Sequence, residues 1–332
     1  MIRSTVSAFA VPSHEERKSF ISLEKTPDIH AATLASLACM NTVRTGGATG
    51  DVRQLAFPFT VAAWNLERCL FPIESAAKLK ATGAPLVLLS EMDEGMARTQ
   101  QSDPTAIVAG ELGMSYAYGV EFLELSLGSE IEHSFCSQDF NEKGFHGNAL
   151  MASTALKDVF LFRLPGEAVW FKDSNEQPRV GERCAIGATV ETEDGSFVAV
   201  SVHLESAANG AYRERQTAAL IDAVEAYAPG LPILIGGDLN TGNHSTNGDF
   251  ESDTLFAMSA SRGFGRHGGP LDQMSTRPSL ITRFPDRAKK LDWFLSRGLK
   301  IGESLLVSSL NGEGKPLSDH DMVVCTIEGF VS

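Results

Sequence analysis

The stretch Ile233-Leu234-Ile235-Gly236-Gly237-Asp238-Leu239-Asn240 decides the fold. Its apolar start has the length of a buried strand. The paired glycines allow a sharp turn and let a ligand approach the backbone closely. Asp238 could then accept a proton from a water molecule that Asn240 holds. The same residues could instead form an ordinary Gly-Asp-Asn turn.

Similar polar motifs follow one another along the chain, and most of them sit at the end of a predicted strand. Loops that a rigid scaffold holds in place commonly carry function, so these strand ends are candidates for one site. The motifs are Trp64-Asn65-Leu66, Ser90-Glu91, Gly147-Asn148-Ala149, Val202-His203-Leu204, Leu291-Asp292-Trp293 and Ser318-Asp319-His320.

Carboxylates and imidazoles dominate these motifs. Glu91 could be a hard oxygen ligand for Mg²⁺, although it could also be a surface glutamate after a buried strand. Asp319 and His320 are adjacent, so in an extended chain their side chains point apart. Asp319 could face a metal ion while His320 faces a phosphate. Asp292 would then be free to orient and stabilise a cationic His320 imidazole.

The pattern along the chain is one of many short strands with few helices between them. This predicts an α/β fold in which two β-sheets pack together with helices outside. Asp194-Gly195 predicts a hairpin between residues 184–191 and 196–203. Other strands are expected at 60–64, 86–89, 116–125, 149–152, 159–164, 233–235, 293–295, 305–308 and 322–327, and helices at 74–80 and 212–227.

Residues 1–57 have a different pattern and predict a helical extension on a main domain that spans 58–332. Ser13 and Glu16 have the spacing of a capping box that opens a short helix. Asp28 is expected to cap a second helix over residues 29–40. Residues 45–50 are rich in glycine and predict a loop.

Composition limits the possible partners. The chain has 332 residues, 43% apolar content and a formal net charge of −14, which disfavours extensive binding to duplex nucleic acid. Its five cysteines lack CxxC spacing and are expected to be buried thiols in a reducing compartment. The sequence shows no signal peptide and no membrane span, so we expect a cytoplasmic protein.

The ordered motifs resemble those of the endonuclease/exonuclease/phosphatase superfamily from Phe57 to Ile327. The resemblance implies a four-layer α/β sandwich of two packed mixed β-sheets flanked by helices, with the site at one rim. It also implies Mg²⁺ or Mn²⁺ as cofactor. The implied metal residues are Asn65, Glu91 and Asp319, and the implied catalytic residues are Asp238, Asn240, Asp292, His320, His203, Asn148 and Glu121. Ser90 departs from the pattern, because the superfamily usually has glutamine there.

Glu121 is the expected partner of His203, because Tyr116-Ala117-Tyr118 precedes it as in the deoxyribonuclease branch. A carboxylate beside His203 would raise the pKa of the imidazole and make it cationic. Glu121 could also be a surface carboxylate on an edge strand. One of Arg179, Arg183 and Arg213 is a candidate to contact a substrate phosphate. Asp93, Glu94, His133 and His146 are candidates to hold a second metal.

These features predict a divalent-metal-dependent phosphohydrolase, and a phosphodiesterase in particular. Its substrate would be a phosphate ester of unknown identity: nucleic acid, lipid or a small molecule. One alternative is a metal-dependent hydrolase or lyase that uses the same site on a non-phosphate substrate. Another is a binding protein that kept the fold and lost catalysis.

Overall fold

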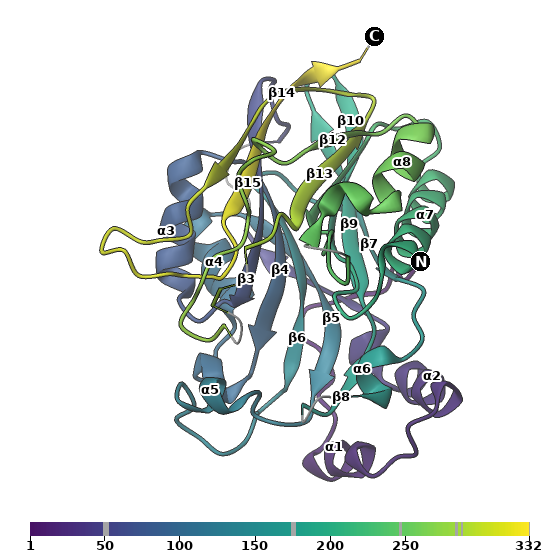
Figure 1. Cartoon of the computed structure of the whole chain (residues 1–332), viewed down its shortest axis with the longest axis vertical. Helices are drawn as coiled ribbons and strands as arrows, with labels where there is room; N and C mark the ends of the chain where they lie inside the picture. Colours follow the sequence, from purple (N-terminus) through teal and green to yellow (C-terminus); the bar gives the residue numbers. More distant parts are fainter. Residues whose placement is uncertain (49–52, 174–176, 246–247, 283–284, 287, 332) are drawn as a thin grey trace.

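Two mixed β-sheets lie face to face in the computed structural model, with helices on both outer sides (Figure 1). The structure describes residues 1–332 except 49–52, 174–176, 246–247, 283–284, 287 and 332. Within those residues, nine strands form the larger sheet in the order β1-β2-β5-β6-β4-β3-β15-β14, with β8 paired to β5. Six described strands form the smaller sheet in the order β12-β13-β11-β10-β9-β7.

The strands of the larger sheet are β1 (Thr5–Val6), β2 (Val43–Gly47), β3 (Phe59–Arg68), β4 (Leu86–Glu94), β5 (Ser115–Glu124), β6 (Phe145–Ala152), β8 (Arg179–Gly181), β14 (Leu299–Val307) and β15 (Met322–Phe330). Those of the smaller sheet are β7 (Lys157–Arg163), β9 (Cys184–Thr192), β10 (Gly195–His203), β11 (Ile233–Asp238), β12 (Gly265–His267) and β13 (Asp292–Arg297).

Alternation along β3 shows how the layers form. Successive side chains of a strand point to opposite faces. Val61 and Ala63 belong to the core between the two sheets. Ala62 and Trp64 belong to a separate core on the outer face. Both faces of β3 are therefore buried, which explains why its sequence is apolar without alternating polar residues.

Helices cover each outer face. Helices α3 (Pro72–Thr82) and α4 (Pro104–Leu112) pack on the larger sheet, and α7 (Gly210–Tyr227) packs on the smaller one beside α8 (Thr254–Ser261). These layers confirm the predicted four-layer α/β sandwich. The shorter helices are α1 (His14–Ile21), α2 (Pro27–Ser36), α5 (Glu130–His133) and α6 (Val169–Lys172), with 3₁₀ turns at Ala38–Met40, Ala97–Thr99 and Phe250–Ser252.

The first 57 residues contain two helices, as expected, but also strands β1 and β2. The predicted capping box is present at Ser13 and Glu16. The predicted cap at Asp28 is wrong, because Thr26 caps α2 and Pro27 occupies its first turn. The predicted loop is also wrong in part, because residues 45–47 pair with β5 in the larger sheet; residues 49 and 50 lie outside the described part.

The topology brings the polar strand ends to one rim. Strands β3 and β4 run parallel, and so do β10 and β11. Their carboxyl ends therefore carry Asn65, Glu91, His203 and Asp238 to neighbouring positions, with His203 directly opposite Asp238 in the register. None of the helices in the described residues is long and apolar enough to span a membrane.

Candidate functional site

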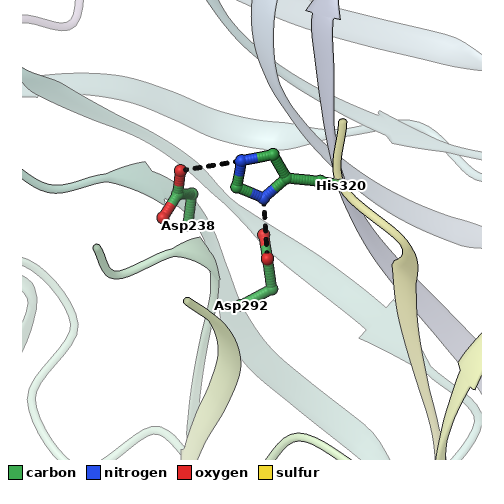
Figure 2. A group of neighbouring side chains, drawn as sticks. All are labelled: Asp238, Asp292 and His320. Carbon is green, nitrogen blue, oxygen red and sulfur yellow. Dashed lines mark hydrogen bonds and ion pairs between the residues drawn. The ribbon is translucent and has the colours of Figure 1, made fainter. Parts of the chain in front are cut away.

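His320 lies between two carboxylates (Figure 2). Its Nδ1 is 2.8 Å from Asp292 Oδ2, and its Nε2 is 3.8 Å from Asp238 Oδ2. The Ser275 hydroxyl also donates to Asp292 Oδ2, at 2.6 Å. Trp64 Nε1 donates to the His320 carbonyl at 2.7 Å, which fixes the backbone of this loop to β3. The structure thus brings together the predicted pair of His320 and Asp292.

Charge in this group favours a protonated imidazole. Burial alone would lower the pKa of His320, but Asp292, Asp319 and Asp238 together raise it well above its ordinary value. Burial raises the pKa of Asp238 to about 7, against the lowering effect of His320. Asp238, Asp292 and His320 are close enough to hold a metal ion. The same three residues are also spaced for proton transfer, because a carboxylate flanks each ring nitrogen of His320.

Asp238 is fixed by two amides. Its Oδ1 accepts the Asn240 backbone N–H at 2.8 Å, and its Oδ2 accepts Asn65 Nδ2 at 3.1 Å. Asn65 Nδ2 also donates to Glu91 Oε1 at 3.1 Å, while its Oδ1 accepts the Glu67 backbone N–H at 3.0 Å. Asn65 therefore links the carboxylates of Glu91 and Asp238 through its nitrogen.

The Asn240 side chain, expected to hold a water molecule, is engaged with neighbouring loops. Its Nδ2 donates to the Leu204 carbonyl at 3.0 Å, and its Oδ1 accepts Asn243 Nδ2 at 2.7 Å. Asn240 has φ 52°, a left-handed conformation that asparagine tolerates better than most residues. Its clearest contribution is to hold Asp238 through the backbone.

A cluster of carboxylates next to Asn65 suits a divalent cation. Glu91, Asp319 and Glu67 line the same cleft. Burial, and then Asp319 and Glu91, raise the pKa of Glu67 well above its ordinary value. Burial also raises the pKa of Asp319 to about 6, with Glu91 adding to the shift. Carboxylate oxygens are the donors that Mg²⁺ or Mn²⁺ prefers, although the group of described residues whose ligand atoms lie within 4.8 Å of one another is Asp238, Asp292 and His320.

Sequence reasoning missed Glu67 and Arg68, although they directly follow Trp64-Asn65-Leu66. Glu67 accepts the Asp319 backbone N–H at 3.0 Å and so ties two loops together. Arg68 contacts Glu91 through Nη1. Burial would raise the pKa of Glu91, but Arg68, and then His203, hold it well below its ordinary value.

The expected pairing of Glu121 with His203 is present, but Arg183 lies against both residues. The two residues are close, at 3.5 Å between Glu121 Oε1 and His203 Nδ1. Arg183 Nη1 lies against both, 2.5 Å from Glu121 Oε1 and 2.8 Å from His203 Nδ1. Burial and the Arg183 charge lower the pKa of His203 well below its ordinary value. Arg183 Nη1 also lies 3.0 Å from His203 Nε2, so the guanidinium contacts both ring nitrogens and its charge disfavours a cationic His203.

Asn148 and Glu121 lie behind His203 and do not reach the surface, with exposed fractions of 0%. Asn148 Nδ2 donates to Glu121 Oε2 at 2.8 Å and to the Cys184 carbonyl at 2.9 Å. Glu121 is thus not the exposed edge-strand carboxylate of the alternative interpretation. Its contacts hold the Arg183 and His203 side chains in place.

The cleft lined by Glu67, Glu91 and Asp319 has a volume of about 470 Å³. Besides the carboxylates, its walls include Arg68, Arg179, Arg183, Trp170 and Ile281. Arg213, the third arginine considered for a phosphate contact, is buried in an ion pair with Asp253 at 2.9 Å.

The four residues suggested for a second metal do not converge in the described structure. Asp93 binds Arg98 and His146. Glu94 binds Lys143 at 2.6 Å. His133 is exposed on α5. This arrangement does not support the second-metal hypothesis, because the acidic residues already have cationic partners.

No family model and no curated protein sequence matches the chain. Solved structures do. An endonuclease/exonuclease/phosphatase from Beutenbergia cavernae is similar over 82% of this chain and 72% of its own, with 18% identity and a TM-score of 0.58. The human Nocturnin catalytic domain with bound sulfate is similar over 87% and 97%, with 15% identity and a TM-score of 0.56.

A third structure, D. rerio TDP2 complexed with a single-strand DNA product, is similar over 82% of this chain and 99% of its own, with 15% identity and a TM-score of 0.53. Identities this low establish the architecture and not the activity. Together with the layer order described above, they show that the chain has the endonuclease/exonuclease/phosphatase fold.

Proposed function

We propose that this chain is a divalent-metal-dependent phosphohydrolase that acts on phosphodiesters. The observation that carries the proposal is the convergence of two groups at one rim: the acid–base group of His320, Asp292 and Asp238, and the carboxylate cluster of Glu91 and Asp319. Asn65 bonds to both groups. Phosphate ester hydrolysis needs a cation for the phosphate and a base for the water at adjacent positions.

Glu91 and Asp319 would hold Mg²⁺ or Mn²⁺, with Asn65 and Glu67 beside them. A bound ion would polarise a phosphoryl oxygen and offset the charge that develops during the reaction. Asp238, whose pKa of about 7 suits a general base, takes the proton of the attacking water. His320, kept cationic by its carboxylates, donates to the phosphate or to the departing oxygen.

His203 and the residues that contact it have a different proposed role from the one expected. His203 Nε2 lies 3.9 Å from Glu91 Oε1 and 3.6 Å from Asp238 Oδ2. It positions these two carboxylates, and Arg183 supplies the positive charge on that side of the cleft. Asn148 and Glu121 hold Arg183 and His203 in place, and Asn240 holds Asp238.

The comparisons add support for an anionic substrate. The Nocturnin structure carries a sulfate anion, and the TDP2 structure carries a single-strand DNA product. The net charge of −14 favours a small or single-stranded phosphodiester over extended duplex nucleic acid. The free cysteines, four of them buried, fit the reducing conditions of a cytoplasmic location.

A chromogenic diester, bis(4-nitrophenyl) phosphate, tests the proposal directly. Wild-type protein should hydrolyse it with Mg²⁺ or Mn²⁺ and stop when chelator is in excess. Glu91→Gln should remove activity or raise the metal requirement, whereas Glu193→Gln, at an exposed turn, should behave as wild type. Full activity in excess chelator would refute the metal role. A panel of single-stranded DNA, RNA, phospholipids and cyclic nucleotides then identifies the substrate class.

A further inference from the structure

Arg68 reaches the cleft through an unusual stretch of backbone. The parallel pairing of β3 with β4 loses its register between Asn65 and Arg68. Glu67, Arg68 and Cys69 follow one another with φ of 44°, 78° and 57°. Non-glycine residues in this left-handed region cost free energy and persist where the surrounding structure imposes them, often at functional sites. This strained turn is what places the guanidinium beside Glu91.

The guanidinium of Arg68 has two carboxylate partners. Nη1 contacts Glu91 Oε2 in the cleft. Nε donates to Glu132 Oε1 at 2.8 Å on the other side. Glu132 is itself well anchored, because its Oε1 also lies 3.1 Å from Arg98 Nη1 and its Oε2 accepts the Ser129 backbone N–H at 2.6 Å. Arg68 would therefore keep an ion pair with Glu132 if it lost Glu91.

Two cations compete for the Glu91 carboxylate: the Arg68 guanidinium and a bound metal ion. Its Oε1 already accepts Asn65, and its Oε2 is occupied by Arg68. A divalent ion bound to Oε2 would compete with the guanidinium for the lone pairs of that oxygen and would repel its positive charge. The side chains of Arg68 and Glu91 are 17% and 18% exposed, so the exchange can occur from the cleft without opening the fold.

We propose that Arg68 occupies the metal's place on Glu91 in the metal-free protein, is displaced by the incoming ion, and then binds a phosphate oxygen of the substrate. This inference rests on the proposed function. Held by Glu132 through Nε, the displaced guanidinium still faces the cleft with its Nη groups. Arginine suits this role because its planar donors bind carboxylates and phosphates with the same geometry.

The proposal predicts effects of opposite sign on metal and substrate. Arg68→Gln removes the competitor and should tighten Mn²⁺ binding about tenfold, the scale of one lost charge-assisted hydrogen bond. The same variant should lower kcat/KM for bis(4-nitrophenyl) phosphate by at least about tenfold, because a phosphate contact is lost. An arginine that only lies near the site would also tighten metal binding when removed, through lost repulsion, but its removal would not lower kcat/KM.

Calorimetric titration of Mn²⁺ into the full chain tests the metal half without any turnover. Arg215→Gln is the matched control, because Arg215 forms an exposed ion pair with Glu167 at 3.0 Å. Glu132→Gln gives a second, independent test. Without its anchor Arg68 is bound more firmly to Glu91, so Mn²⁺ binding should weaken.

The outcomes separate the two proposals. Wild-type protein that neither binds Mn²⁺ nor hydrolyses the diester would refute the proposed function itself. Wild-type protein that does both, while Arg68→Gln binds Mn²⁺ no more tightly, would refute the displacement alone. Tighter Mn²⁺ binding with unchanged kcat/KM would refute the substrate contact. If Arg68→Gln does not fold, unchanged Mn²⁺ affinity in Glu132→Gln would overturn the inference.

Discussion

The His320 imidazole has its Nδ1 committed to Asp292 and its Nε2 directed toward Asp238. His320→Ala removes the proton donor while leaving the strands intact. The rate should fall at least ~100-fold, the low end for a positioned acid or base. Initial rates on bis(4-nitrophenyl) phosphate measure the loss, and circular dichroism confirms the fold. A variant near the wild-type rate would show that the Ser318-Asp319-His320 motif has another role.

Asp238 gives the reaction a definite pH dependence. Its carboxyl must be ionised to accept a proton, and burial raises its pKa to about 7. Because this pKa lies above its ordinary value of 3.8, the carboxyl becomes protonated as the pH falls below about 7. The active, ionised form is then lost. kcat/KM should drop about tenfold per pH unit there. A profile that stays flat from about pH 5 to 8 would contradict this assignment.

Arg183 and Glu121 form a buried ion pair, so replacing one partner and replacing both should change the unfolding free energy in a non-additive way. Glu121→Gln leaves the Arg183 charge without its nearest carboxylate and should cost ~3–5 kcal/mol of unfolding free energy. The double variant with Arg183→Met also removes the 3.6 Å contact of Arg183 with Glu205, so its loss should be smaller than the sum of the two single losses only by the Glu121–Arg183 coupling. Urea denaturation of the wild type and three variants completes the cycle. Additive losses would show that the charges do not interact.

The sequence predicted which residues lie together at the rim, but not which arginine side chains pair with them. The motifs identify Asp238 at the end of β11, Asp292 at the start of the antiparallel β13 and His320 just before β15, because strand direction brings these positions to one rim. The position of Arg68 depends on a left-handed turn, and that of Arg183 on a loop crossing to the other sheet. Neither follows from local pattern, so the effect of the Arg183 charge on His203 could not be predicted.

At the scale of elements, helix α7 is attached to the loop after β11 through Arg213. This buried side chain donates to Asp253, to the Ala208 carbonyl at 2.6 Å and to the Asn243 carbonyl at 2.9 Å. Arg213→Met leaves Asp253 buried without its partner and should cost ~3–5 kcal/mol. Arg215→Met, on an exposed part of the same helix, should leave stability nearly unchanged. Equal midpoints in urea for the two variants would contradict the attachment.

Element boundaries were predictable where the local signal was strong. The hairpin expected at Asp194-Gly195 is present, with Thr192 opposite Gly195 in the β9–β10 register. The start of α2 was misplaced because Asp28 is a good cap in isolation, while the Thr26-Pro27 pair is the actual signal. Strand β2 was missed because its Gly46-Gly47 end resembles a loop and only pairing with β5 makes it a strand.

For the whole molecule, the net charge of −14 opposes the approach of any anionic substrate. Salt screens this repulsion, since the screening length falls from ~30 Å at 0.01 M to ~8 Å at 0.15 M. kcat/KM for a small phosphodiester should therefore rise with NaCl over that range at fixed metal occupancy. A steep fall would instead reveal a basic track for polyanions, as in duplex-binding proteins.

Strand β3 lies between β4 and β15, and β15 is the last strand of the described chain. While a ribosome is still making the protein, β3 therefore has an open, apolar edge that nothing nearby in sequence can close. Such edges invite pairing with other chains. His320 arrives just ahead of β15, so the same late segment that protects the sheet also completes the catalytic group. A nascent chain would lack the His320 side chain, and keep an open strand edge, until β15 had emerged.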